Sequence, residues 1–273
     1  MTRIESAFKN LKQQNKKALI PYVMAGDPSP DSFVGLLHGL VEHGADMIEV
    51  GLPFSDPMAD GPTVALAGER ALAGGTSTFN AIAMVKKFRE NNTTTPIILM
   101  GYLNPVEIIG YDKFISICQD AGVDGVLIVD LPPAESGDFV QRLAEHDMNE
   151  IFLLAPTTLP ERRKQVMTYC GGYIYYVSLK GVTGSASLDT TAVGEQVQAI
   201  KQETDLPICV GFGIRDSQSA AAIGRYADGV IVGSELVKNF AGLDSQSSPD
   251  QVAAAQAKVM SKMDELRQAL DAL

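Results

Sequence analysis

The chain has 273 residues and contains no tryptophan, only three cysteines and no long hydrophobic run. The cysteines, Cys118, Cys170 and Cys209, lie far apart and include no CxxC pair, so they form no disulfide framework and fit a reducing compartment. No apolar run approaches the roughly 20 residues that a membrane-spanning helix needs. The opening stretch MTRIESAFKNLKQQNKK is charged and amphipathic and lacks the apolar core of a secretory signal. We therefore expect a cytoplasmic protein that does not enter a membrane.

Positive charge is also scarce. The 22 Lys and Arg residues face 33 Asp and Glu residues, which gives a formal net charge of -11. Such a surface repels a phosphate backbone, so nucleic acid is a poor partner. An anionic substrate must instead be held by local features such as backbone N–H groups. The 45% hydrophobic content is enough to bury a sizeable core, which argues against disorder.

Eight short apolar runs rich in β-branched residues predict strands. Most are continuous rather than alternating, as expected for strands buried on both faces. They lie at 18–24, 46–51, 96–102, 125–130, 150–155, 173–178, 207–213 and 229–234. Apolar residues at helical spacing separate these runs. The helical patterns lie at 31–43, 78–90, 111–121, 135–147, 160–169, 190–203 and 216–224.

This alternation predicts a (β/α)₈ TIM barrel that forms one domain over residues 1–273. A helix at 2–14 precedes the first strand and is expected to close the barrel floor. A long helix at 248–272 ends the chain, and its apolar stripe suits either a short coiled coil or packing against the outer helices. The alternative fold, a doubly wound open sheet, normally carries an early GxGxxG, which this sequence lacks.

An internal echo supports the repeated architecture. The segments HGADMIEVG, AGVDGVLIVD and YADGVIVGS each end a helix and begin a strand with a small residue, an aspartate and an apolar run. Strands 96–102 and 207–213 also share a form that begins with proline.

The active site of this fold lies at the carboxyl ends of the strands, in the loops that lead to the helices. Two of these loops are long, 51–62 and 178–190, and long loops in a compact domain are usually functional or disordered. The second contains Gly181 and Gly184 among small residues, which suits a mobile lid.

Glycines after two neighbouring strands indicate a phosphate site. Strand 207–213 ends in Gly211-Phe212-Gly213, and strand 229–234 ends in Gly233-Ser234, with Ser234 placed to begin a helix. Glycine lets backbone N–H groups approach an anion, and a helix N-terminus adds a favourable dipole. The same glycines also suit tight turns, but loops at these two strands are the recurrent phosphate site of the fold.

Carboxylates at strand ends are the candidate catalysts. Glu49 lies inside strand 46–51 with no basic partner close in sequence, and burial should raise its pKa toward neutrality, as suits a group that both donates and accepts a proton. Asp60 ends the first long loop and suits either catalysis or helix capping. Asp56 between Ser55 and Pro57 is more typical of a turn. The aspartates of AGDP and VDLPP, Asp27 and Asp130, suit either loop bracing or substrate contact.

Other chemistries fit less well. The three histidines fall on predicted helices or at their ends, away from the strand ends, which argues against a histidine-based metal site. They are His38, His43 and His146. Lys180 is the one alternative catalyst, because aldolases on barrels use a Schiff-base lysine. It lies in the predicted lid, whereas such a lysine should be rigid and desolvated.

Several segments together resemble the α subunit of tryptophan synthase over essentially the whole chain. The resemblance rests on residues 21–28 (PYVMAGDP), 49–62 (EVGLPFSDPMADGP), 100–105 (MGYLNP), 122–133 (GVDGVLIVDLPP), 155–158 (APTT), 175–184 (YYVSLKGVTG), 210–215 (VGFGIR) and 228–237 (DGVIVGSELV). The segment that contains the acids is highly specific, whereas the glycine segments alone are not.

The resemblance implies a retro-aldol cleavage of indole-3-glycerol phosphate to indole and glyceraldehyde 3-phosphate, with no metal or cofactor in this chain. Glu49 would be the acid/base and Asp60 would hold the indole N–H. Most of the implied substrate-binding residues fall into two groups. Tyr22, Met100, Leu127 and Phe212 would line the indole pocket, and Gly184, Gly213, Gly233 and Ser234 would hold the phosphate. Tyr175 would be the family's site tyrosine, and Tyr102 and Thr183 would also bind the substrate.

The resemblance also implies a partner, a β subunit that carries pyridoxal phosphate, in an α2β2 complex that passes indole through a tunnel. The partner would lie against the loops around Pro53 to Asp56 and Asn104. The sequence departs from the family at Gly101, where a polar residue is common, and at Lys180, where a small or hydroxyl residue is common. Two other functions stay open, a Schiff-base or other phosphosugar enzyme and a chain that only activates a partner.

Overall fold

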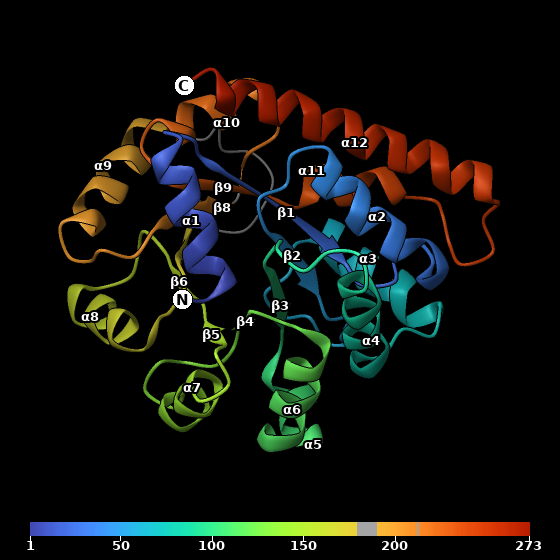
Figure 1. Ribbon diagram of the computed structural model, residues 1–273, viewed down its shortest axis with the longest axis horizontal. Coiled ribbons are helices and arrows are strands. Elements are labelled where there is room, and N and C mark those ends of the chain that lie inside the picture. Colours follow the sequence, from blue (N-terminus) through green and yellow to red (C-terminus); the bar gives the residue numbers. More distant parts are fainter. Residues whose placement is uncertain (179–189, 212) are drawn as a thin grey trace.

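Short parallel strands form a ring at the centre of the computed structural model, which describes residues 1–178, 190–211 and 213–273 (Figure 1). In these residues the strands run in the order β5-β4-β3-β2-β1-β9-β8-β7-β6. Their bounds are β1 (Ala18–Met24), β2 (Ile48–Gly51), β3 (Ile97–Gly101), β4 (Gly125–Ile128), β5 (Asn149–Glu150), β6 (Phe152–Leu154), β7 (Ile174–Val177), β8 (Ile208–Gly211) and β9 (Gly229–Val232). Each predicted strand is therefore present, and the predicted barrel is confirmed.

The predicted strand at 150–155 is divided in two, and this division explains why nine strands replace eight. β5 pairs with β4, and β6 pairs with β7. Ile151 stands between them, and its N–H donates to the Val126 carbonyl at 2.8 Å. One short segment thus changes neighbours partway along its length and joins the two ends of the sheet.

Helices surround the ring. In the described part of the chain they are α1 (Arg3–Gln13), α2 (Pro30–Glu42), α3 (Pro62–Ala73), α4 (Thr78–Arg89), α5 (Leu103–Ile109), α6 (Tyr111–Ala121), α7 (Gly137–Ala144), α8 (Pro160–Tyr169), α9 (Thr190–Lys201), α10 (Ser217–Gly224), α11 (Ser234–Val237) and α12 (Pro249–Asp271). α11 begins at Ser234, as predicted. The sequence patterns did not predict α3 or α5, both of which follow directly from site loops.

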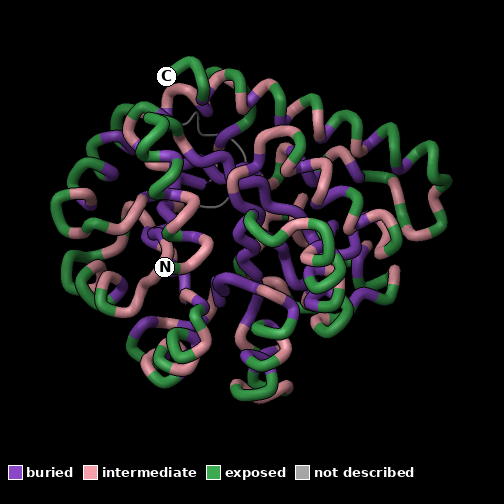
Figure 2. The backbone as a smooth tube through the Cα atoms, in the orientation of Figure 1, coloured by how far each residue is buried: buried purple, intermediate pink, exposed green. Residues whose placement is uncertain are grey.

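The barrel interior is a packed apolar cluster closed at one end by α1. Ile4, Phe8 and Leu11 of α1 pack with inward side chains of the strands, and Figure 2 shows the strands as buried. The members from the strands or the residues directly beside them are Ala18, Ile20, Met47, Ile98, Leu127, Ile151, Tyr173, Tyr175, Cys209 and Ile231. Because α1 covers the end from which the strands begin, it keeps water from entering the barrel interior at that end.

The apolar stripe of α12 packs against the outside of the barrel rather than forming a coiled coil. Val252, Val259, Met263, Leu266 and Leu270 are buried, and α12 contacts α2 and α10. Figure 1 shows α12 lying across these helices. None of the helices in residues 1–178, 190–211 and 213–273 is long and apolar enough to cross a membrane.

The echoed aspartates have a common structural role. Asp46, Asp124 and Asp228 precede β2, β4 and β9, and each carboxylate accepts a backbone N–H at the start of a neighbouring strand. The donors are Leu19 at 2.8 Å, Ile97 at 2.8 Å and Ile208 at 2.9 Å. Each carboxylate also pairs with a basic side chain, Arg267, Arg89 or Lys201 respectively. The echo therefore marks the end of the barrel opposite the predicted site.

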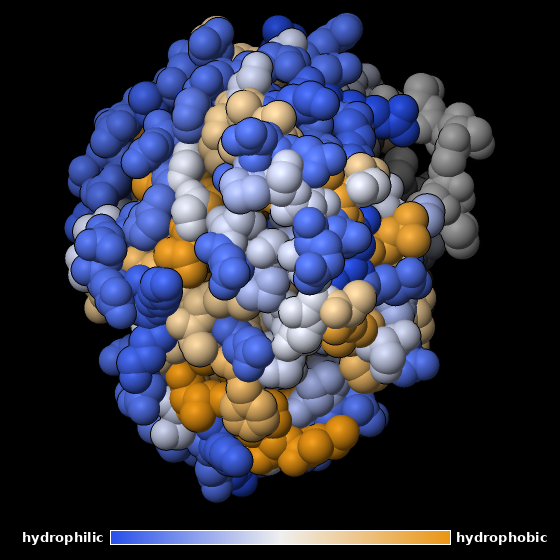
Figure 3. All heavy atoms as spheres, turned by 90° about the vertical axis from the view of Figure 1, so that its right-hand side faces the viewer, coloured by the Kyte–Doolittle hydropathy of each residue, from blue (hydrophilic) through white to orange (hydrophobic). Residues whose placement is uncertain are grey.

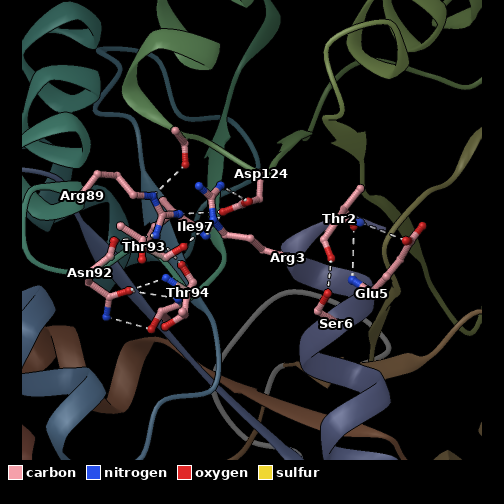
Figure 4. Close-up of polar contacts among 12 residues, drawn as sticks. Thr2, Arg3, Glu5, Ser6, Arg89, Asn92, Thr93, Thr94, Ile97 and Asp124 are labelled. Atoms are coloured by element: carbon pink, nitrogen blue, oxygen red, sulfur yellow. Dashed lines mark hydrogen bonds and ion pairs between the residues drawn. The ribbon is translucent and has the colours of Figure 1, made fainter.

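Asp124 is the most buried of the three and has two basic partners (Figure 4). Its carboxylate bonds Arg89 at 2.7 Å and Arg3 of α1 at 2.8 Å. Burial lowers the pKa of Arg89 to about 10, although the Asp124 charge opposes this shift. The ion pair between Asp124 and Arg3 thus links α1 to the ring of strands.

We expect Asp124→Ala to lower the free energy of unfolding by about 3–5 kcal/mol, because it leaves the buried Arg89 guanidinium and the Ile97 N–H without this partner. Urea denaturation measures the loss. Asp112→Ala is the matched control, because it removes an exposed partner of Arg142 and should cost far less. Equal losses in the two variants would contradict the assigned role of Asp124.

Candidate functional site

Glu49 is a fully buried carboxyl group in β2, flanked in register by Tyr22 of β1 and Ile98 of β3. The Tyr173 hydroxyl donates to its Oε1 at 2.5 Å, whereas Oε2 has no hydrogen-bond partner. Within the described residues no Lys or Arg forms an ion pair with it. Burial raises the pKa of Glu49 to about 7, and the Tyr173 bond opposes that rise. The predicted direction of the shift is thus confirmed.

Tyr173 is a site residue that the sequence patterns did not identify. It lies immediately before β7 and two residues before Tyr175, and both side chains join the apolar cluster inside the barrel. Burial is the main cause that raises the pKa of both phenols well above the usual value, and the Glu49 charge adds to it. Both tyrosines therefore stay neutral and can donate hydrogen bonds near Glu49.

Two glycines make room for the ring hydroxyls. A Cβ at Gly51 would lie 2.2 Å from the Tyr22 hydroxyl, and a Cβ at Gly211 would lie 2.1 Å from the Tyr175 hydroxyl. Any larger residue would displace these rings. The end glycines of β2 and β8 thus allow Tyr22 and Tyr175 to fill the barrel mouth above Glu49.

Asp60 lies at the end of the loop that follows β2, a loop that runs from Leu52 to Gly61 and that we call the acid loop. Its side chain is partly buried. Burial raises the pKa of Asp60, and a hydrogen bond with Tyr102 opposes the rise. Burial raises the pKa of Tyr22, and the Asp60 charge adds to that rise. The acid loop therefore brings Asp60 toward the same tyrosine that flanks Glu49.

The remaining predicted acids brace loops. Asp27 is buried and forms two bonds of 2.8 Å with Arg70 of α3, and burial is the main cause that raises its pKa. Asp130 accepts the Leu103 N–H at 2.7 Å. Asp56 is exposed and accepts a hydrogen bond of 2.5 Å from the neighbouring Ser55 hydroxyl, as a turn former does.

The predicted indole-pocket residues lie around the same mouth. Met100 of β3 is in register with Leu127 of β4, and Met100 also packs with Tyr22. Gly213 follows the end of β8 and has a φ of 80°. Gly233 follows the end of β9, precedes α11 and lies against Tyr22. The structure therefore brings Tyr22, Glu49, Met100, Leu127 and Tyr175 together. Four named residues, Phe212, Lys180, Thr183 and Gly184, lie outside the described residues, as does most of the loop 178–190.

A cavity of about 230 Å³ opens beside this mouth, between the loop after β4 and α8. Val129, Asp130, Leu153 and Arg162 line it, and neither Glu49 nor Asp60 does. The three histidines lie on outer helices or just beyond them, and two have outer partners, with His43 bonded to Asp264 and His146 to Gln119. The expected location of the histidines, away from the site, is confirmed.

The ring of parallel strands and the position of Glu49 define the class: a (β/α)₈ barrel with a buried carboxyl group near the carboxyl ends of its strands. A family model described as tryptophan synthase alpha chain matches residues 8–269. The chain therefore belongs to the tryptophan synthase alpha chain family.

Individual relatives agree with this assignment. A tryptophan synthase alpha chain from Psychrobacter sp. (strain PRwf-1) is 82% identical over all of this chain and 99% of its own length. The alpha chain of Acinetobacter baumannii (strain AYE) is 55% identical over the full length of both. A crystal structure of tryptophan synthase subunit alpha from Legionella pneumophila str. Paris superposes with a TM-score of 0.89 at 39% identity and covers 100% of both chains.

We expect Glu49→Gln to change how stability depends on pH. Folding raises the pKa of Glu49 from 4.5 to about 7, so its protonated form contributes stability that is complete below pH 4.5 and is lost as pH rises through about 7. The variant avoids this loss and should be roughly 3 kcal/mol more stable than wild type near pH 8, with little difference near pH 4.5. Thermal unfolding across pH tests this, and a constant difference would contradict the assigned pKa.

Proposed function

We propose that this chain cleaves indole-3-glycerol phosphate to indole and glyceraldehyde 3-phosphate as a carbon–carbon lyase. The observation that carries the proposal is a carboxyl group, Glu49, that is fully buried and has a pKa of about 7. Such a group is populated in both protonation states near neutral pH, so it can give a proton and take one back. Membership of the tryptophan synthase alpha chain family supports the same reaction.

The reaction transfers two protons, one from Glu49 and one back to it, and breaks one carbon–carbon bond. Protonated Glu49 gives its proton to indole C3, and the resulting carboxylate takes the proton from the glycerol hydroxyl next to the ring. The bond between C3 and the glycerol carbon then breaks, and its electron pair stays with the indole. The hydroxyl carbon becomes the aldehyde, and Glu49 is again protonated. Tyr173 stabilises the intermediate carboxylate through its bond to Oε1.

Asp60 has the complementary role. Protonation at C3 places positive charge on the indole ring, and an ionised Asp60 that accepts the indole N–H stabilises that charge. The Tyr102 hydrogen bond favours the ionised form against the effect of partial burial. One acid thus cycles between two forms while the other stays charged.

The other site residues hold the substrate. Tyr22, Met100, Tyr102, Leu127, Tyr175 and Phe212 surround the indole. The phosphate and lid contacts come from Thr183, Gly184, Gly213, Gly233 and Ser234. Backbone N–H groups at the start of α11 supply hydrogen-bond donors for the phosphate. No metal or cofactor in this chain is needed for the proton transfer between C3 and the hydroxyl.

We further propose a β subunit partner that carries pyridoxal phosphate and receives the indole in a cytoplasmic α2β2 complex. Met58 in the acid loop and Ile108 on α5 are each 79% exposed, near the segments where the resemblance places the partner. Figure 3 shows hydrophobic side chains gathered at the lower edge of one face, at the height where Figure 1 draws α5 and α6. Exposed apolar groups of this kind mark protein interfaces. Neither nucleic acid nor a membrane is part of this proposal.

We expect Glu49→Gln and Asp60→Asn each to lower indole release from indole-3-glycerol phosphate by about 10²–10⁴-fold, since each removes a proton or charge that the transition state needs. Glu150→Gln is the matched control, because Glu150 is equally buried but bonds Ile128 outside the site. Full activity of Glu49→Gln would overturn the lyase mechanism. Borohydride trapping of substrate on Lys180 would instead support a Schiff-base aldolase.

We expect added β subunit to accelerate indole release by the purified chain. Met58→Glu and Ile108→Glu should each weaken the complex by roughly ten- to a hundredfold, because they put a charge into an apolar contact. Phe79→Glu is the control, since Phe79 is also exposed but lies on α4. Titration calorimetry measures the affinity. Equal weakening by all three variants would contradict the proposed interface, and a silent chain that still activates the partner would favour a non-enzymatic role.

A further inference from the structure

Tyr102 holds the acid loop at two places. This residue ends the β3 segment, is only 4% exposed and immediately precedes α5. Its ring packs on the Phe54 ring near the start of the loop, with centroids 5.5 Å apart. Its hydroxyl accepts the Ala59 N–H at 3.0 Å near the end of the loop, next to Asp60, and opposes the rise in the pKa of that carboxyl. One side chain therefore spans the whole loop.

The acid loop has few other anchors. Residues 55, 56, 58 and 59 are exposed. Leu52 N–H donates to the Met100 carbonyl at 2.8 Å where the loop begins; beyond it, in the described part of the chain, the hydrogen bond from residues 53–60 to a residue outside the loop is the one from Ala59 to Tyr102. The remaining bonds stay within the loop, such as Met58 N–H to the Asp56 carbonyl at 2.9 Å. The position of Asp60 therefore depends on the position of the Tyr102 ring.

The loop after β4 fixes Tyr102 from both sides. Val129 N–H donates to the Gly101 carbonyl at 2.9 Å, and the Asp130 carboxylate accepts the Leu103 N–H at 2.7 Å. The first N–H groups of a helix have no partner within the helix, and Tyr102, which precedes α5, offers no side-chain cap. Asp130 supplies the missing acceptor from a different strand end. The backbone on each side of Tyr102 is thus held by residues of one neighbouring loop.

We propose that Asp130 and Tyr102 are positioning residues for the lyase reaction, with Asp130 fixing Tyr102 and Tyr102 holding the acid loop so that Asp60 stays ionised beside the substrate. This inference rests on the proposed function. Asp130 acts here through its acceptor oxygen rather than through its charge, because the hydrogen-bond partner of Asp130 is a neutral backbone N–H. The Tyr102 hydroxyl likewise has a task that does not require contact with the substrate.

The groups that face Asp60 set the sign of the effect. They are the Tyr102 phenol from the end of β3 and the Tyr22 phenol from β1, with Glu49 of β2 beyond Tyr22 and Asp130 facing Tyr102 from the loop after β4. Of these, the hydrogen bond from Tyr102 favours the ionised carboxylate. Its removal raises the pKa of Asp60, so activity should be lost at a higher pH as the solution is acidified.

The test uses four variants of the full chain. Tyr102→Phe keeps the ring on Phe54 but removes the hydroxyl. Asp130→Ala removes the acceptor for Leu103, whereas Asp130→Asn removes the charge and keeps an acceptor oxygen. Ser248→Ala is the control for loss of a helix cap, because Ser248 caps α12 on the outside of the barrel.

We expect Tyr102→Phe to lower kcat/KM by about 10- to 100-fold near neutral pH and to move its acidic limb upward. Asp130→Ala should shift the limb in the same direction by a smaller amount, and Asp130→Asn and Ser248→Ala should leave it in place. An unmoved limb in Tyr102→Phe, or equal losses in Asp130→Asn and Asp130→Ala, would overturn the inference.

Two further measurements do not depend on turnover. Hydrogen exchange at the Ala59 amide should quicken in Tyr102→Phe and Asp130→Ala, and exchange at Leu103 should quicken in Asp130→Ala alone. Carbon-13 NMR of the Asp60 carboxyl should report the raised pKa in Tyr102→Phe. If wild type fails to cleave the substrate but these changes occur, the proposed function fails while the positioning network stands. Unchanged exchange and titration would reject the network itself.

Discussion

The burial of one carboxyl group constrains the rest of this barrel. An ionised Glu49 without water is costly, and a single bond from Tyr173 offsets only part of that cost, so its pKa rises to about 7. Three neighbouring features keep water away from Glu49. α1 closes the opposite end of the ring, the divided β5 and β6 segment joins its edges, and Tyr22 and Tyr175 fill the mouth. Loss of any one would let water in and return the carboxyl toward an ordinary acid.

Acidic residues have different roles at the two ends of the strands. Asp46, Asp124 and Asp228 lie where strands begin, and each is satisfied by a backbone N–H and a basic side chain. Glu49 lies toward the other end with one oxygen unsatisfied, and Asp60 has partners that only partly offset its burial. Full pairing stabilises the fold, whereas incomplete pairing at the site-bearing end leaves Glu49 able to exchange a proton; Glu150 also has an unpaired oxygen but lies outside the site.

Most of the fold and part of the site could be predicted from the sequence, because continuous apolar runs and helical spacing record local burial. α3 was missed because it follows directly from a loop rich in proline and glycine, and α5 because it has only seven residues and is separated from β3 by Tyr102 alone. Tyr173 was missed because its bond to Glu49 joins residues 124 positions apart, although its place two residues before Tyr175 was a usable signal. The bracing roles of Asp27 and Asp130 could not be chosen either, because their partners lie far away in the sequence, on α3 and at the start of α5.

The two acids are supported by different kinds of structure, and the chemistry explains why. Glu49 must exchange protons in a fixed, desolvated place, and a strand buried on both faces supplies that rigidity. Asp60 must meet a substrate that enters from solvent, so it lies on a largely exposed loop. A charge on such a loop has no fixed position by itself. The described contacts supply one through Tyr102, which is held in turn by the neighbouring strand end. The Tyr102 hydroxyl, fixed at a strand end, contacts the exposed acid loop. The substrate thus keeps access to the loop, and Asp60 gains a defined electrostatic partner.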